Sequence, residues 1–290
     1  MAERRAALAR AAQEGIDHVA VGDHVSFFVG AGSDGLINAT AVLSMQTELP
    51  VYVGLYLLPL RHPVPVARQL ASIAELAPGR LTLGVGIGGE DPHEVEICGV
   101  EQRTRGRRMD ECLEVLRGLA TGERFDFEGR FFSLDAAQIV PAPSPPIPLV
   151  VGGRSEAALV RAGRLGDGWL GVWVSPQRFA AAVAQVGEVA VAAGRDPSTF
   201  EHGMNVWCGF GATRESARAV LAAGMEHFYR IPFESFERYS PYGTPGDVAE
   251  FLAPYVEAGC RTFNVIPCTG DGLGEEAAVG EVRRLLRTVD

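Results

Sequence analysis

The sequence predicts an α/β fold in which strands and helices alternate along one domain. Short apolar runs alternate with longer stretches in which apolar residues recur at helical spacing. The short runs are continuously apolar, as expected of parallel strands that are covered on both faces. The 290 residues are enough for one barrel of eight strand–helix units. These three observations favour a (β/α)8 TIM barrel.

Seven apolar runs are predicted as strands. They cover residues 16–22, 51–57, 81–87, 147–151, 168–172, 204–211 and 262–266. A helix precedes the first run, so the chain begins inside the helix that should follow a first barrel strand. We therefore expect a barrel that lacks its first strand, and a true N-terminus upstream of Met1 is left open. The alternative is an open doubly wound sheet, but VGDHVSF after the first run is no glycine fingerprint.

Helix boundaries can also be read from the sequence. Residues 105–121 place an apolar stripe on one helix face, formed by Met109, Cys112, Leu113, Leu116 and Leu119. Thr244-Pro245-Gly246-Asp247 predicts a helix start, with an N-cap, a proline at the first position and an acid in the first turn. Ser175-Pro176 predicts another start, and Gly15, Gly194 and Gly259 stand where helices should stop.

Two insertions interrupt the alternation. The first, near residues 123–146, contains FDFEGRFFSL, which predicts a short hairpin around Glu128-Gly129, and a proline-rich segment. The second, near residues 227–242, is rich in aromatic residues. We expect a single domain over residues 1–290 that includes both insertions.

Composition excludes several classes of function. The net charge of −10 disfavours nucleic acid and anionic membranes as partners. The longest apolar run, residues 51–60, is half of the ~20 residues that a membrane span needs. Five cysteines form no CxxC pair, which argues against a disulfide framework or a structural zinc site and for a reducing cytoplasm. A small-molecule partner is expected, and a homodimer is left open.

Four segments at the predicted carboxyl ends of strands carry candidate site residues. The first is Asp23-His24, in which an imidazole can transfer a proton beside an orienting acid; the alternative is an N-cap beside a surface histidine. The second is the apolar segment 54–63, which can form a floor under a flat ring, with Arg61 near an anion. A buried strand that leaves by a proline turn is the simpler interpretation of that segment.

The third segment, residues 84–90, is rich in glycine and lets backbone approach a ligand. Glu90, Asp91, His93 and Glu94 follow it, but their spacing matches no metal site, and solvated charge is the interpretation we favour. The fourth is Gly152-Gly153-Arg154-Ser155, which opens a helix after an apolar strand. Glycines, a hydroxyl and a helix N-terminus bind anions, and the arginine adds charge-assisted contacts to a phosphate.

In chain order, these motifs resemble the luciferase-like flavin and deazaflavin monooxygenase superfamily, and specifically its actinobacterial branch that uses coenzyme F420. The resemblance covers almost the whole chain and is carried by GDHV, LPLRHPVPVARQLASIAELAPGRLTLGVGIGG, RGRRMDECLEVLRGL, PPIPLVVGG, AGRLGDGW and GTPGDVAEFLAPYVEAGC.

The resemblance implies a luciferase-like (β/α)8 barrel that binds a flavin-type ring at the strand ends. It implies that Asp23 and His24 meet the ring and substrate, with His24 as proton donor or acceptor. It implies a non-prolyl cis peptide at Gly54-Leu55 under the ring, ring contacts from Ile87 and Gly88, and a phosphate loop formed by Gly152, Gly153, Arg154 and Ser155. A catalytic glutamate that some deazaflavin dehydrogenases carry is displaced here, because Gly89 precedes Glu90.

The leading hypothesis is therefore an oxidoreductase that transfers hydride between coenzyme F420 and a small organic substrate. An FMN-dependent monooxygenase that uses reduced flavin and O2 is the alternative within the class. Outside it stand a cofactor-binding or truncated non-catalytic barrel protein and a metal-dependent hydrolase using His24 and His93. We expect no metal. The substrate cannot be inferred from the sequence.

Overall fold

A computed structural model describes residues 1–30, 32–89, 91–270 and 274–287, which divide into two compact units. The first unit consists of Met1–Val19, Leu170–Gln185 and Glu201–Asp290, and the second of Ala20–Trp169 and Val186–Phe200. Strand β1 (Val19–Val21), strand β7 (Trp169–Val172) and helix α7 (Pro176–Ala192) contain residues of both units. The expectation of one domain over residues 1–290 stays a prediction.

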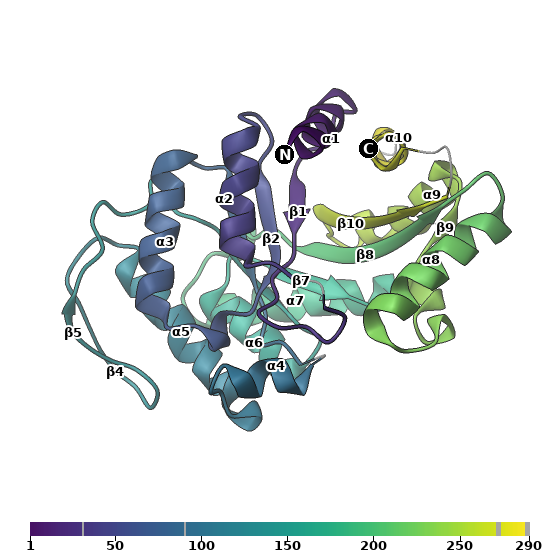
Figure 1. Ribbon diagram of the computed structural model, residues 1–290. Helices are drawn as coiled ribbons and strands as arrows, with labels where there is room; N and C mark the ends of the chain where they lie inside the picture. The colour runs from purple at the N-terminus through teal and green to yellow at the C-terminus, as the bar shows by residue number, and fades with distance from the viewer. Residues whose placement is uncertain (31, 90, 271–273, 288–290) are drawn as a thin grey trace. The chain divides into compact units, whose positions relative to one another are not determined.

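The second unit is built on the parallel strands β2 (Val51–Tyr56), β3 (Leu81–Val85) and β6 (Leu149–Gly152). Strand β2 pairs with β3, and β3 pairs with β6. The side chains of Val53, Leu83 and Val85 have no exposed surface, as the continuously apolar runs predict. The helices are α2 (Gly35–Met45), α3 (Pro63–Leu76), α4 (Pro92–Ile97), α5 (Arg105–Leu119) and α6 (Glu156–Leu165), with short 3-10 turns η1 (Leu58–Leu60), η2 (Gln102–Thr104) and η3 (Pro197–Thr199) (Figure 1).

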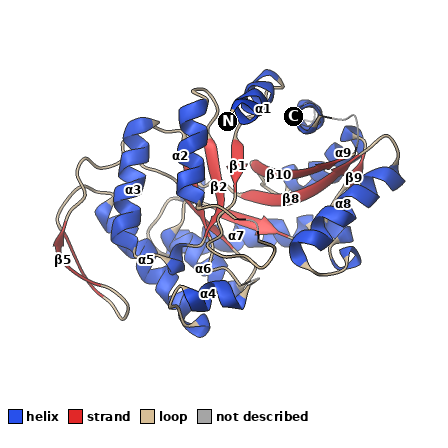
Figure 2. Ribbon diagram, in the orientation of Figure 1, coloured by secondary structure: helices blue, strands red, loops and turns tan. Residues whose placement is uncertain are grey.

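The hairpin predicted in the first insertion is present in this unit. Strands β4 (Phe125–Glu128) and β5 (Ser133–Ala137) pair antiparallel, and Figure 2 shows them as a separate ribbon beside the helices. The carboxylate of Glu111, on α5, accepts hydrogen bonds from the N–H groups of Arg130 at 2.8 Å and Phe131 at 2.8 Å. One side chain of α5 therefore holds the turn of the hairpin.

The first unit is also built on parallel strands. Residues 170–172 of β7 pair with β8 (Gly203–Phe210), which pairs with β10 (Thr262–Thr269) and at its end with β9 (Tyr242–Gly243). The helices are α1 (Ala2–Gln13), α8 (Arg214–Tyr229), α9 (Pro245–Glu257) and α10 (Glu275–Arg287), with 3-10 turns η4 (Phe233–Ser235) and η5 (Glu237–Tyr239). The second predicted insertion supplies η4, η5 and β9, and its Phe233 and Phe236 pack in a buried cluster with Leu221 and Met225 of α8.

The predicted fold class is confirmed. Each of the seven predicted strands overlaps one strand of the parallel βα series, namely β1, β2, β3, β6, β7, β8 and β10. The predicted apolar stripe on α5 is buried throughout. Thr244 and Asp247 form a capping box at the start of α9, and Gly15, Gly194 and Gly259 follow helix ends with positive φ.

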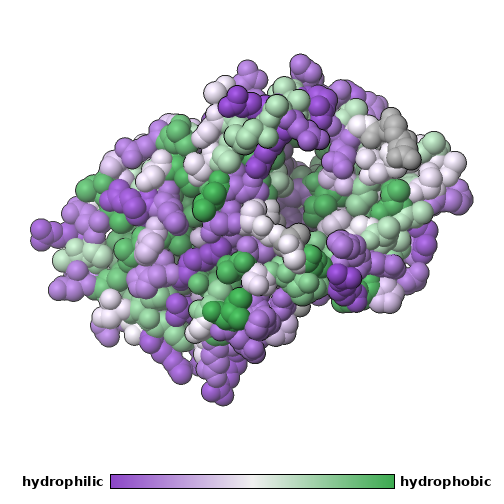
Figure 3. All heavy atoms as spheres, in the orientation of Figure 1, coloured by the Kyte–Doolittle hydropathy of each residue, from purple (hydrophilic) through white to green (hydrophobic). Residues whose placement is uncertain are grey.

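Surface character agrees with these assignments. On the face drawn in Figure 3, hydrophobic side chains are interspersed with hydrophilic ones. No helix in the part of the chain that the structure describes combines the length and apolar character needed for a membrane span.

Candidate active site

The structure brings the ends of the three strands β1, β2 and β3 together at one edge of the sheet. The Asp23 carboxylate, after β1, accepts a hydrogen bond from the N–H of Leu57, after β2, at 2.8 Å. The N–H of Gly86, after β3, donates to the carbonyl oxygen of Tyr56 at 2.9 Å. The carboxyl ends of parallel strands are where α/β proteins bind ligands, so this edge is the candidate active site.

Asp23 is buried in a bidentate ion pair with Arg61. Its carboxylate oxygens accept hydrogen bonds from Nη1 of Arg61 at 2.6 Å and from Nη2 at 2.8 Å. The N–H groups of Gly35 and Leu57 donate to the same carboxylate, each at 2.8 Å. The Asp23 side chain has no exposed surface. These four donors tie the end of β1 to the end of β2 and to the start of α2.

Arg61 has two further neighbours. Its Nη2 lies 3.2 Å from Oδ2 of Asp34, the N-cap of α2, and its guanidinium carbon lies 4.4 Å from the centre of the Tyr56 ring. Burial raises the pKa of the Asp23 carboxyl, and the Arg61 charge opposes that rise. Burial alone would lower the pKa of Arg61, but the carboxylate of Asp23 raises it above its usual range. The anion that the sequence predicts near Arg61 is thus the protein's own Asp23.

His24, the next residue, is held by a different carboxylate. Its Nδ1 lies 3.1 Å from Oε2 of Glu94, and its ring stacks on that of Phe27 with centroids 4.0 Å apart. Oε1 of Glu94 also accepts from the N–H groups of Val25 at 2.6 Å and Ser26 at 3.0 Å. The His24 side chain is 20% exposed, whereas that of Glu94 is 3% exposed. The imidazole therefore reaches the surface while its partner stays inside.

This geometry assigns the two ring nitrogens different roles. A carboxylate that accepts hydrogen bonds at Nδ1 favours the tautomer with the hydrogen on Nδ1. Nε2 is then the basic nitrogen of the neutral ring. The His24–Glu94 pair has the arrangement of an imidazole oriented for acid–base chemistry.

Glu94 is the site residue that the sequence interpretation got wrong. Residues 90–94 were interpreted as solvated charge, but Glu94 and Asp91 are both buried. Glu94 accepts from the His24 ring and two backbone N–H groups, and Asp91 caps α4 by accepting from the N–H of His93 at 2.9 Å. Only His93 has the predicted exposure, and Glu90 lies outside the described residues.

The predicted bulge at Gly54-Leu55 is present. The peptide bond is cis, and the register between β2 and β3 shifts between Val53 and Tyr56. The Leu55 side chain lies against the glycines of the neighbouring strands: a Cβ on Gly152 would come 2.2 Å from Leu55 Cδ1, and a Cβ on Gly86 would come 2.9 Å from it. A side chain at either glycine would force Leu55 to move, and Leu55 supplies a half-buried apolar surface at the edge of the sheet.

Ile87 and Gly88 form the turn after β3. Both are half-buried, and Gly88 has a φ of +69°. The carbonyl oxygen of Gly88 accepts a hydrogen bond from Nη1 of Arg105, at the start of α5, at 2.8 Å. Arg105 therefore fixes the turn, and ring contact by Ile87 and Gly88 stays a prediction.

The predicted phosphate loop opens α6. Gly153 has a φ of +123°, and a Cβ there would come 2.9 Å from the Cβ of Ala158. Its carbonyl oxygen accepts from Nε1 of Trp169 at 2.7 Å, and Ser155 caps the helix by accepting from the N–H of Ala158 at 3.3 Å. The loop thus directs the N-terminus of a ten-residue helix outward, with Arg154 and Ser155 exposed and an acid, Glu156, in its first turn.

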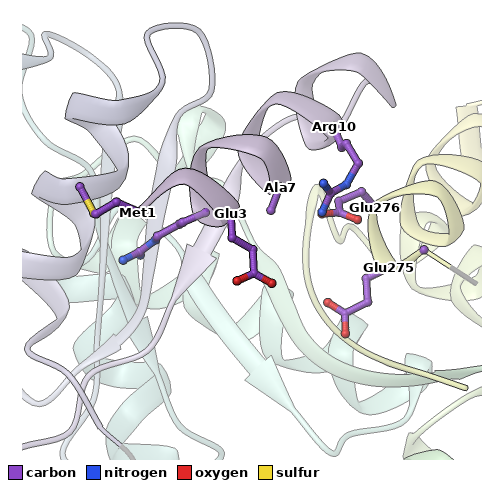
Figure 4. A pocket seen from close by; sticks show the side chains of 8 residues that line it. Met1, Glu3, Ala7, Arg10, Glu275 and Glu276 are labelled. Carbon is purple, nitrogen blue, oxygen red and sulfur yellow. The ribbon is translucent and has the colours of Figure 1, made fainter. Parts of the chain in front are cut away.

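Two further observations concern metal binding and cavities. Among the described residues, no three histidine, cysteine, aspartate or glutamate side chains are grouped so as to hold a metal ion. In the first unit, a hollow of about 570 Å³ lies between α1 and α10 (Figure 4). Glu3 and Glu275 point into it, and Arg10 is paired with Glu276 at 2.9 Å. The residues that line it include none of the predicted site residues.

Comparison with known proteins gives a consistent result. The model of the family described as luciferase-like monooxygenase matches residues 2–251. An uncharacterized protein of Mycobacterium tuberculosis is 42% identical over 165 residues, covering 57% of this chain and 56% of the relative. A protein of Nakamurella multipartita named F420-dependent glucose-6-phosphate dehydrogenase is 33% identical over 182 residues, covering 56% of this chain and 50% of the relative. The chain thus spans about half the length of these curated relatives.

A solved structure resembles the chain over nearly its full length. It is an F420-dependent secondary alcohol dehydrogenase in complex with an F420–acetone adduct, with a TM-score of 0.85 and 22% sequence identity, covering 98% of this chain and 94% of that one. At this identity the likeness concerns the fold. It agrees with the parallel α/β architecture described above.

Proposed function

The chain belongs to the luciferase-like monooxygenase family, and on this premise we propose that it is an oxidoreductase that uses coenzyme F420. In this proposal it transfers hydride to or from a small organic substrate. The observation that carries it is the His24–Glu94 pair, a partly exposed imidazole oriented by a buried carboxylate at the carboxyl edge of the sheet. The F420-dependent relatives support the choice of coenzyme.

The residues at this edge fit such a coenzyme. Leu55 offers an apolar surface to a flat ring, and the turn at Ile87 and Gly88 flanks it. Gly153 leaves the space before α6 open, because a side chain there would collide with Ala158. The helix N-terminus and Arg154 suit a phosphate, whereas Glu156 in the first turn adds a charge that opposes it. We assign ring contact to Leu55, Ile87 and Gly88, and phosphate contact to Gly152, Gly153, Arg154 and Ser155.

The chain's own residues supply proton transfer and position. When bound, a deazaflavin supplies the carbon that exchanges a hydride, and the redox chemistry is its own. Nε2 of His24 accepts the hydroxyl proton of an alcohol or returns it to a carbonyl oxygen. The alcohol is oxidised by losing that proton and a hydride, and the ketone is reduced by gaining both. Glu94 orients the ring and stabilises the imidazolium.

Asp23 acts in this proposal as a positioning residue. Its carboxylate already accepts four hydrogen bonds and has no exposed surface, so it is not offered to a substrate. By holding the end of β1 against Leu57 and Gly35, it fixes the backbone from which His24 projects. This differs from the direct ring or substrate contact that the family resemblance implies for it.

An FMN-dependent monooxygenase is the second candidate, and the family description favours it. The test is anaerobic turnover of coenzyme F420 with an alcohol or ketone, followed by coenzyme absorbance, beside oxygen uptake with reduced FMN. The proposal expects the anaerobic reaction and no substrate-dependent oxygen uptake. Oxygen uptake with FMN and no F420 turnover would replace it with the monooxygenase. Binding of either coenzyme with no turnover would favour a non-catalytic binding protein.

A further inference from the structure

Three large apolar side chains of the second unit are exposed around the His24–Glu94 pair. Val25 is 49% exposed, Phe28 43% and Ile97 50%. We call these three residues the apolar rim. Single exposed apolar side chains are ordinary on protein surfaces, but a group of them beside a polar site marks a binding surface.

Each rim residue is tied to the pair by a contact or by one helical turn. The N–H of Val25 donates to Oε1 of Glu94 at 2.6 Å. The ring of Phe28 lies 4.3 Å from that of Phe27, which stacks on His24 at 4.0 Å. Ile97 follows Glu94 by three residues on α4, and so lies on the same face of that helix. In Figure 3, hydrophobic side chains reach the surface in the area where Figure 1 places α4.

The neighbouring aromatic residue gives a contrast within the same loop. Phe27 is only 5% exposed and packs on the imidazole, whereas Phe28 beside it is turned outward. The loop therefore buries one phenyl ring to support His24 and presents the next one to solvent. When an apolar ligand group is placed against Phe28, both the ligand group and the phenyl ring lose contact with water, which favours binding.

The two carboxylates that pair with His24 and Arg61 are directed inward. The side chain of Glu94 is 3% exposed and that of Asp23 is fully buried, so neither carboxylate is presented at the surface. The Arg61 guanidinium is engaged by Asp23 and Asp34. The two buried carboxylates are thus not presented to a substrate, whereas the apolar side chains of the rim are exposed beside the imidazole.

From this arrangement we propose that the rim formed by Val25, Phe28 and Ile97 binds an aliphatic or aromatic group of the substrate. The substrate class is then an uncharged alcohol or ketone with an apolar chain, rather than a phosphorylated sugar. This inference takes the reacting group of the substrate, an alcohol or a carbonyl, from the proposed function. The binding of the apolar group itself does not depend on the coenzyme.

The experiment measures binding of a series of 2-alkanols, from 2-propanol to 2-octanol, by saturation-transfer NMR, with glucose 6-phosphate as the charged comparison. The proteins are wild type, Phe28→Ser, Ile97→Ser and the control Leu76→Ser. Leu76 is 53% exposed at the far end of α3, so it matches the rim residues in exposure only. Coenzyme F420 binding is measured in the same samples by fluorescence.

We expect wild-type affinity to rise about fourfold for each added methylene, the ratio that corresponds to full burial of that group. In Phe28→Ser and Ile97→Ser the rise falls below about twofold per methylene, and Leu76→Ser keeps the wild-type slope. The inference would be overturned if both rim variants kept the wild-type slope, or if the slope fell in Leu76→Ser as well. Tighter binding of glucose 6-phosphate than of 2-octanol would also overturn it. Intact slopes without F420 binding would contradict the proposed function and leave the rim assignment standing.

Discussion

Asp23 and His24 are neighbours in sequence, yet the structure gives them opposite surroundings. Asp23 has no exposed surface and accepts four hydrogen bonds, two of them from Arg61. His24 is part-exposed, and Nδ1 of its ring lies 3.1 Å from the buried carboxylate of Glu94. A carboxylate stands at the centre of both arrangements, but only the His24–Glu94 pair brings an imidazole to the surface.

At this edge of the sheet, burial separates structural from chemical roles more than residue type does. A carboxylate whose oxygens are all engaged stabilises the fold as long as its cation stays in place. An imidazole supported from behind, with part of its ring exposed, can exchange a proton with a ligand. Variants of single residues can change the structural role or the chemical role separately.

Replacing His24 should have the largest effect on activity. General acid–base groups contribute about 10²–10⁴-fold to turnover, so His24→Ala should lower kcat by that range and leave coenzyme affinity within about twofold. The measurement is steady-state turnover beside a coenzyme titration. His93→Ala is the matched control, because His93 is exposed on α4 and next to Glu94. Equal losses of kcat and affinity would make His24 a binding residue, and no loss would make it a surface histidine.

Asp23→Asn should act on stability. It leaves the Arg61 guanidinium without its carboxylate in a buried setting, which costs about 3–5 kcal/mol in the free energy of unfolding measured with urea. Asp17→Asn is the control, because Asp17 forms the same bidentate pair with Arg283 at 2.6 Å but is 55% exposed. The control should change by less than about 1 kcal/mol. A small effect at both positions would show that the Asp23–Arg61 pair does not hold the strand ends together.

Glu94→Gln tests the support behind His24. The amide keeps the size of the side chain but removes the charge that stabilises the imidazolium, so kcat should fall by about 10–100-fold, less than for His24→Ala. KM and the urea midpoint should stay near wild type. In the double variant with His24→Ala, the Glu94→Gln loss should disappear, because the two residues act through one ring. Additive losses would separate Glu94 from the chemistry.

Gly153→Asp should have the smallest effect of this set. It places a carboxylate at the start of α6, where the proposal puts a phosphate, and should weaken coenzyme binding by about tenfold. Because Gly153 has a φ of +123°, Gly153→Asn controls for backbone strain and should lose less affinity. Wild-type affinity in a folded Gly153→Asp variant would remove the phosphate from this loop.

Local patterns predicted much of the fold. Strand β2 follows from a continuously apolar run, the hairpin from Glu128-Gly129 between aromatic residues, and α9 from Thr244 and Asp247 at its start. These features depend on residues close together in the chain. The cis bond at Gly54-Leu55 came from the family resemblance, since residue spacing gives no reason for it.

The site was harder to predict because its partners are far apart in sequence. Glu94 and His24 are separated by 70 positions, and Asp23 and Arg61 by 38. The sequence does hold one clue to Glu94: Asp91-Pro92 starts a helix and places Glu94 in its first turn, at the carboxyl edge of β3. Whether that side chain faces water or the end of β1 depends on tertiary packing alone.

The most direct test of the central claim is a parallel titration of the wild-type chain with coenzyme F420 and FMN, followed by fluorescence. The account predicts saturable binding of F420 at one site per chain, at least about tenfold tighter than FMN. It also predicts that Gly152→Ala weakens this binding, because its Cβ would displace Leu55, against which the proposal places the ring. No F420 binding, tighter binding of FMN, or a Gly152→Ala variant with unchanged affinity would contradict it.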